Sequence, residues 1–377
     1  MKIGIVTPFN SGNVGTLLQA FATQRVINNL GYEADIVDYS YRASNNPFLV
    51  SNLVRRGLKN YLMAIAGHLL RLPKRKRILA FIGDNLKLSV PVRDHDELCE
   101  LNGVYDYFLV GSDAVWNTGP FGLELAYLLD FVFDNNKKGN YASSFGSSNV
   151  PEEHRGVFER YLSEFRFLSV REVRGQELIR GLIGREVPVV LDPTLLLDSG
   201  FWSGFAEKSE LRFDRGFIFV AEYSISEKLL SDALVLADKF DCDIVCAFPP
   251  KGKRVKARVL LKADPCDFMF LIKNARFVLT DSFHVSVFSV NFNTSFMSYV
   301  TDRTKVSASR FESAFGLFGL MDRLVYDNSE VRSECLADSY SDVDFEGVNL
   351  VLEREREASM GYLREQLDEV SRTIYKP

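Results

Sequence analysis

The sequence has 377 residues, 46% of them hydrophobic and 25% charged, and a formal net charge of −5. A chain of this length and balance predicts two globular domains rather than one core or a disordered chain. Nothing in the small net charge argues for nucleic acid as a partner, and any anion site has to be local. No apolar run approaches the roughly 20 residues of a spanning helix, and the first residues lack a signal-peptide pattern, so we expect a cytosolic protein.

The first forty residues predict a strand, a helix and a second strand, which together open a parallel sheet. A Gly- and Asn-rich loop precedes the helix, which Thr16 can cap and Gly31 can end. Residues 41–100 break this alternation with helical, strongly basic sequence, and we interpret them as an insertion. Further strands of this half are expected at 107–110, 138–144, 167–170 and 187–191.

The second half repeats the alternation of strands and helices, so we expect an α/β fold with two Rossmann-like domains. We place the first domain at 1–195 and the second at 196–345. A long charged helix at 346–377 follows, which can pack back onto the first domain. The apolar run that ends at Thr280 shows no alternation, as expected for a central parallel strand.

Within the insertion, the segment 61–77 joins an apolar stretch to the basic cluster Arg71 and Lys74 to Arg77. Such a segment can lie on an anionic membrane surface. A solvated, charged helix face is the simpler interpretation, and we prefer it.

The stretch TDSFHVSVF, residues 280–288, carries the strongest functional signal. It follows a buried strand, and open α/β sheets bind ligands beyond such strand ends. Asp281 or Ser282 can cap the next helix, which places His284 in its first turn. Unpaired N–H groups there favour an anion, to which a histidine can deliver a proton. The alternative is a structural histidine; we favour a catalytic one.

Three further stretches offer candidate binding residues. In SVREVRG, Arg171 and Arg174 are three residues apart, so we expect them on one helical face, where they can grip one anion; two surface arginines are an equal alternative. In VGSDAVWN, Asp113, Trp116 and Asn117 combine a carboxylate, an aromatic face and an amide, as sugar sites do, although taken alone the stretch favours a capping Asp and a core Trp. In SGNVG, Gly12 and Asn13 allow backbone N–H groups to approach a ligand. Lys273 and Arg310 are additional basic candidates.

These stretches, in this order, resemble the polysaccharide pyruvyl transferase family. The similar segments also include LLQAFATQRVINNLG, SFGSS, VVLDPTLLL and SRFESAFGLFGLMDR. The resemblance implies a GT-B-like pair of domains facing a cleft and transfer of pyruvate from phosphoenolpyruvate to two hydroxyls of a sugar, with release of phosphate. The acceptor would be a surface polysaccharide, such as capsule or exopolysaccharide, or its lipid-linked precursor. No metal or other cofactor is implied.

The resemblance assigns His284 as the essential histidine and Arg171 as the motif arginine, with Arg310 at a further basic position. From the chemistry we add Asp281 to orient His284 and Asp113 to accept an acceptor proton. Arg174, Ser282 and Lys273 would join the arginines at the donor, while Gly12, Asn13, Trp116 and Asn117 would face the acceptor.

Two positions depart from the family pattern: Val285 stands where Gly is common, and Ala114 where Gln is common. These departures keep two alternatives open. One is a glycosyltransferase that uses a nucleotide sugar, and the other is a non-catalytic carbohydrate-binding relative.

Overall fold

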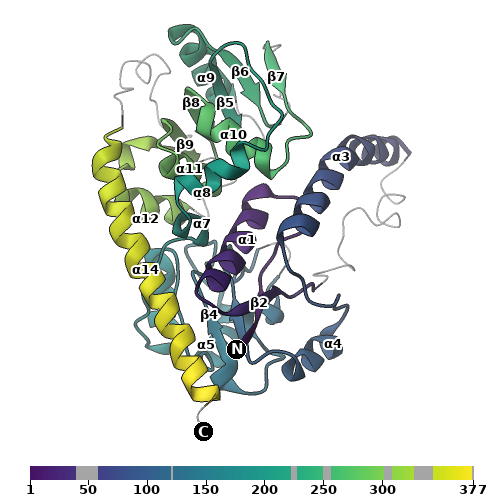
Figure 1. The fold of residues 1–377 in the computed structure, drawn as a ribbon, viewed down its shortest axis with the longest axis vertical. Coiled ribbons are helices and arrows are strands. Elements are labelled where there is room, and N and C mark those ends of the chain that lie inside the picture. The colour runs from purple at the N-terminus through teal and green to yellow at the C-terminus, as the bar shows by residue number, and fades with distance from the viewer. Residues whose placement is uncertain are drawn as a thin grey trace.

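The computed structural model describes residues 1–39, 58–119, 122–221, 227–248, 256–300, 308–326 and 343–375, with side chains of the insertion from Leu72 onward. Its strands form two parallel sheets, one in each half of the chain (Figure 1). The α/β class and the GT-B-like pair of Rossmann-like domains expected from the sequence are confirmed.

The first sheet has four parallel strands in the order β2-β1-β3-β4. Their bounds are β1 Lys2–Val6, β2 Glu33–Ile36, β3 Tyr107–Val110 and β4 Lys138–Asn140. The strands expected at 167–170 and 187–191 appear as isolated bridges: Gly139 with Phe167, Ser143 with Val170, and Val170 with Val189. Between the bridges at Phe167 and Val170, the side-chain amide of Asn140 exchanges hydrogen bonds of 2.6 and 2.9 Å with the backbone of Ser169, which interrupts the regular pairing there.

Helix α1, Val14–Asn29, follows β1, and 13 of its 16 residues are buried. The cap differs from expectation: Asn13, not Thr16, accepts the backbone N–H of Gly15 at 2.9 Å, because Thr16 is already inside the first turn. The helix ends before Gly31, whose φ of +90° suits glycine. Helices α5 Glu152–Ser163 and α6 Val173–Ile183 belong to the same half.

The second sheet has six parallel strands in the order β10-β9-β8-β5-β6-β7. Four of them match the expected runs: β5 Phe217–Ala221, β6 Asp243–Cys246, β8 Phe277–Thr280 and β9 Phe296–Val300. The sequence reading missed the edge strands β7 Ala257–Val259 and β10 Leu324–Tyr326, which are too short to show a pattern. Its helices are α9 Glu227–Lys239, α10 Pro265–Asn274, α11 Phe283–Asn291 and α12 Ala308–Phe318.

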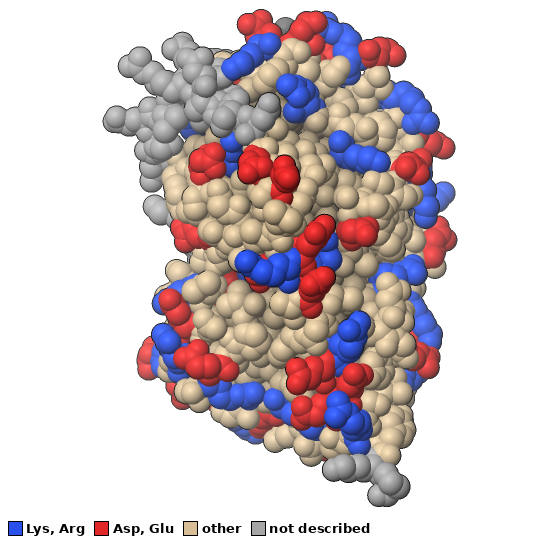
Figure 2. Space-filling view, turned by 60° about the vertical axis from the view of Figure 1, so that its left-hand side comes forward, with Lys and Arg blue, Asp and Glu red and all other residues tan. Residues whose placement is uncertain are grey.

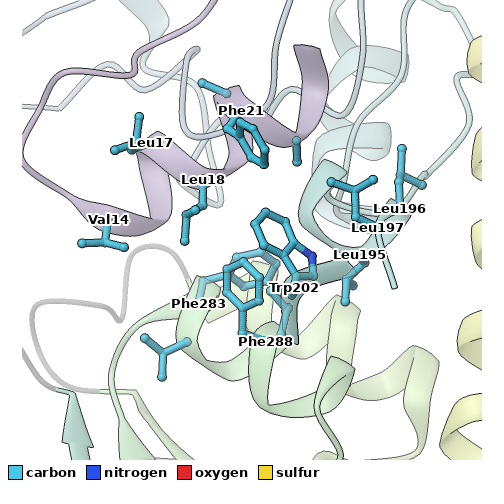
Figure 3. Packing of buried hydrophobic residues seen from close by; sticks show 14 of the residues in the cluster. Val14, Leu17, Leu18, Phe21, Leu195, Leu196, Leu197, Trp202, Phe283 and Phe288 are labelled. Atoms are coloured by element: carbon cyan, nitrogen blue, oxygen red, sulfur yellow. The ribbon is translucent and has the colours of Figure 1, made fainter. Parts of the chain in front are cut away.

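Two short helices, α7 Pro193–Leu196 and α8 Ser199–Ala206, form the passage between the sheets. They complete an apolar interface with α1 and α11, in which Val14, Leu17 and Leu18 face Trp202, Phe283 and Phe288 (Figure 3). The Trp202 ring centroid lies 5.9 Å from that of Phe21 and 5.0 Å from that of Phe288. One hydrophobic cluster therefore runs from the first sheet into the second.

The insertion contains α3 Leu58–Asn85 and α4 His95–Glu100; the first part of the expected range, 41–57, lies outside the described residues. Helix α3 reaches the second domain (Figure 1). Arg77 pairs with Asp264 at 2.6 Å and Asp267 at 3.0 Å, at the start of α10. The ammonium of Lys74 lies 5.4 and 5.6 Å from the ring centroids of Phe248 and Phe268.

The last helix, α14 Phe345–Ile374, runs along both halves of the molecule (Figure 1). Its side chains reach the first sheet, where Gln366 donates to the Tyr107 hydroxyl at 2.9 Å and Tyr362 donates to the Leu168 carbonyl at 3.1 Å. Within the described residues, none of the helices is both long and apolar enough to cross a membrane. Figure 2 shows basic and acidic side chains mixed over the visible face, with no broad region of one sign.

Candidate active site

The site is built around the N-terminus of α11, directly after β8. Ser282 is the N-cap residue, and its side chain makes no cap hydrogen bond, so the capping expected from Ser282 is absent. The Ser282 N–H instead donates to Thr280 Oγ1 at 2.9 Å. His284 lies in the first turn and is 5% exposed. The first N–H groups of this helix therefore lack an intrahelical partner and receive none from the side chain of the cap residue.

His284 lies at a cleft between the two domains, with an empty volume of about 470 Å³. One wall is Gly12 to Gly15 with Leu18, from the first domain. The opposite wall is apolar and comes from the second domain, with Lys74 of α3 beside it. This second wall comprises Ala221, Phe248, Phe268, Met269, Ile272, Val285 and Phe288.

Gly15 lies against the imidazole of His284. A Cβ atom built on Gly15 would lie 2.5 Å from His284 Nδ1 and 2.6 Å from Cγ. Carbon atoms of side chains normally approach to about 3.5 Å or more. Only glycine therefore fits here, and the last glycine of the SGNVG loop serves the histidine rather than a turn.

Arg171 is buried beside Asp192 and does not lie on a helix. Its Nη1 donates to Asp192 Oδ2 at 2.6 Å and to Ser112 Oγ at 3.3 Å. The expected pairing of Arg171 and Arg174 on one helical face is wrong, because α6 begins only at Val173. Arg174 is 41% exposed at its side chain and binds Glu177 and the Ser148 carbonyl, both at 2.6 Å.

A second arginine approaches from α12. The guanidinium carbons of Arg171 and Arg310 lie 4.8 and 5.6 Å from the ring centroid of Phe283. Burial, together with the charge of Arg171, lowers the pKa of Arg310 to about 10. The carboxylates of Asp113, Glu172 and Asp192 belong to the same cluster and counter part of this effect.

Asp113 completes the site from the end of β3 and has a left-handed backbone, with φ of 78°. Its Oδ2 accepts from Thr16 Oγ1 at 2.7 Å, and its Oδ1 lies 3.5 Å from Arg171 Nη2. Burial would raise the pKa of Asp113, but the charges of His284 and Arg171 and the Thr16 hydrogen bond outweigh it and lower the pKa. Strained residues of this kind concentrate at functional sites.

Asp192 and Glu172 were not among the residues that sequence reasoning selected. Asp192 Oδ2 lies 3.7 Å from His284 Nε2, which has no hydrogen-bond partner. Glu172 accepts from Ser144 Oγ at 2.8 Å, and burial raises its pKa. Asp192 directly follows an apolar run, Glu172 follows one after Arg171, and each stands just before a helix. The same signal was used for Asp281 and could have identified both.

Several predicted residues lie away from the cleft. Trp116 is fully buried and donates from Nε1 to the Tyr127 carbonyl at 3.0 Å, so its ring cannot stack on a sugar. Asn117 binds the Gly146 carbonyl at 3.2 Å. Lys273 is exposed beside a different hollow, near Arg212 and Asn274.

Asn13, Gly12, Ser282 and Val285 do line the cleft. Asp281 is buried at the end of β8. Among the residues described, no group of three His, Cys, Asp or Glu side chains could hold a metal ion.

Two parallel sheets joined across a cleft, with His284 at a helix N-terminus lining it, define an α/β protein of the GT-B type. UDP-GlcNAc 2-epimerase from Neisseria meningitidis is similar over 98% of this chain and 99% of its own, with a TM-score of 0.52 and 10% identity. The same enzyme from Methanocaldococcus jannaschii is similar over 94% of this chain and 92% of its own, with a TM-score of 0.50 and 15% identity. A glycosyltransferase from Rickettsia africae is similar over 100% of this chain and 98% of its own, with a TM-score of 0.50 and 10% identity. At these identities the similarity shows the fold alone.

The family follows from the sequence. The model of the polysaccharide pyruvyl transferase family matches residues 13–303, and the protein therefore belongs to this family of enzymes. A search of curated proteins found no match. The matched range includes Gly15, Asp113, Arg171, Asp192 and His284, and ends before Arg310.

Proposed function

We propose that the protein transfers pyruvate from phosphoenolpyruvate to two hydroxyls of a sugar in a surface polysaccharide or its lipid-linked precursor, forming a ketal and releasing phosphate. The observation that carries the proposal is the buried His284, whose Nε2 lacks a hydrogen-bond partner, at the uncapped start of α11. Arg171 and Arg310 approach the neighbouring Phe283 ring, where a strongly charged donor needs cations.

The donor carries roughly −2.5 to −3 charges, counting its phosphate and carboxylate. The N–H groups of α11 and the two guanidiniums would hold these anionic groups. His284 would then donate a proton to the methylene carbon of the donor, which makes the adjacent carbon electrophilic.

One acceptor hydroxyl attacks that carbon, the C–O bond to phosphate breaks, and the second hydroxyl closes the ketal. Of the two hydroxyl protons, one replaces the proton that His284 gave to carbon, and the other leaves on phosphate. Asp113 would accept the first of these protons, the one that finally restores His284. Its lowered pKa keeps it ionised for that role, although a carboxylate held in this way is a weak base.

The acceptor would enter along Gly12 and Asn13, opposite the apolar wall. Trp116, Asn117, Arg174 and Lys273 take no part in this scheme, because their side chains bind elsewhere or lie outside the cleft.

The test is phosphate release from phosphoenolpyruvate with a panel of galactose- and N-acetylmannosamine-containing acceptors. His284→Gln should reduce release by about 10²-fold or more, since general acid catalysis contributes about that much. His154→Gln, in helix α5, is the matched control. Equal release by parent and His284→Gln would overturn the role of the histidine. Turnover of a nucleotide sugar without phosphoenolpyruvate would support a glycosyltransferase instead.

We also propose cytosolic action. For the basic cluster of α3 we still prefer a solvated helix face, and peripheral contact with an anionic membrane is the alternative to be tested. Lys74 and Arg77 already contact the second domain, so the contact would fall to the exposed Arg75 and Lys76. Reversing the charge of these two residues should release the protein from anionic vesicles at low salt. Failure of the parent to bind such vesicles would dismiss the contact.

A further inference from the structure

Asp192 joins the two halves of the site, and the scheme above does not use it. It is the N-cap of α7, where the chain leaves the first sheet. Its Oδ1 accepts from the backbone N–H of Thr194 at 3.0 Å and from Thr194 Oγ1 at 2.7 Å. Its Oδ2 accepts from Arg171 Nη1 at 2.6 Å and Ser112 Oγ at 3.1 Å. The first half of the chain therefore fixes this carboxylate in one orientation.

The imidazole of His284 belongs to the second half and meets this carboxylate across the interface. Nε2 lies 3.7 Å from Asp192 Oδ2, and both side chains are nearly inaccessible, at 7% and 1% exposure. On its other edge, Nδ1 lies against Gly15. The ring is thus held between a backbone that leaves no spare room and a fixed carboxylate.

Charge favours the same arrangement. Burial would raise the pKa of Asp192, but His284, Arg171 and Thr194 outweigh it and hold that pKa well below its usual range. Asp192 is therefore an anion at any working pH. The other charged groups of this cluster come from three elements: Asp113 after β3, Arg171 and Glu172 before α6, and Arg310 on α12.

We propose that Asp192 is a positioning residue, whose carboxylate orients the imidazole of His284 across the domain interface and stabilises its protonated form. The effect of Asp192 on the reaction rate rests on the proposed function, because His284 must carry a proton before it can act as an acid. The effect of Asp192 on the protonation of His284 does not rest on that function. The proposal about Asp192 and the proposed function can therefore fail separately.

The experiment measures the protonation of His284 directly. The chain has only four histidines, so NMR of histidine-labelled protein can follow each imidazole, and His284→Gln identifies the signal of interest. In Asp192→Asn, the pH at which His284 is half protonated should fall by about one unit or more, since an opposite charge within ~4–6 Å has such an effect. Ser112→Ala is the matched control: it removes a neutral hydrogen bond from the same oxygen and should leave that pH near its parent value.

An unchanged half-protonation pH in folded Asp192→Asn would overturn the proposal. If that variant does not fold because Arg171 loses its partner, Arg171→Met combined with Asp192→Asn leaves no unpaired charge at this pair. Its half-protonation pH should lie below that of Arg171→Met alone, and equality would again refute the proposal.

Kinetics separate the inference from the proposed function. If the parent releases phosphate, Asp192→Asn should lose rate near neutral pH and recover much of it at lower pH, which a merely structural role would not produce. If the parent releases none with any acceptor, the proposed function fails, and the NMR comparison still decides whether Asp192 controls His284.

Discussion

The contact between Gly15 and His284 gives the sharpest prediction for substitution. In Gly15→Ala, the new methyl group would lie 2.5–2.7 Å from three atoms of the histidine side chain. Reaching normal contact at about 3.5 Å requires the side chain to retreat by roughly one ångström. A displacement of this size at a reacting group can reduce the rate by about 10²-fold. We therefore expect kcat for phosphate release to fall by about that factor.

The control is Gly156→Ala in helix α5, where a Cβ atom meets nothing within 4 Å. This variant should keep its activity and gain up to about 1 kcal/mol of stability, as alanine does in a helix. Both variants should unfold cooperatively by circular dichroism. A folded Gly15→Ala protein with kcat within threefold of the parent would refute the reasoning, because the imidazole would then tolerate displacement.

Three further predictions concern the surrounding residues. Trp116→Phe should lose about 1 kcal/mol, because it removes the indole hydrogen bond to the Tyr127 carbonyl, and it should leave the KM for the acceptor unchanged. A raised KM with unchanged stability would instead place Trp116 in the acceptor site. Donor binding should take up protons, because burial already raises the pKa of Glu172 and a bound anion raises it further, so affinity should fall as pH rises. Calorimetry in two buffers of different ionisation enthalpy measures this uptake, and none would contradict it. Arg77→Ala should lower the free energy of unfolding by about 1 kcal/mol, as for a half-exposed pair, and a chemical-denaturation change above about 3 kcal/mol would show a larger role.

The sequence was most informative where the pattern was local. The run before Thr280 and the short helix after it predicted β8, α11 and the position of His284 in its first turn. The same reasoning located β3 to the residue. Apolar periodicity responds to a buried environment, and parallel strands are buried on both faces.

Contacts between segments that lie far apart in the chain could not be predicted from the sequence. The fit of Gly15 against His284 joins residues 269 positions apart, and no local pattern encodes that approach. Trp116 was considered for sugar binding because an aromatic ring can either stack on a sugar or pack in a core. Only its complete burial shows that it belongs to the core. The expectation that Arg171 and Arg174 grip one anion from a shared helical face was wrong, because α6 starts two residues later than the sequence suggested.

The apolar cluster that runs through α1, α8 and α11 has a consequence for how the protein unfolds. The two sheets share this cluster, so neither can lose its structure without exposing side chains that the other relies on. Calorimetry should therefore record one transition rather than two, despite the two-sheet architecture. A fragment that ends before α8 would leave Phe21 and its neighbours facing water, and we expect it to aggregate rather than fold as an independent domain.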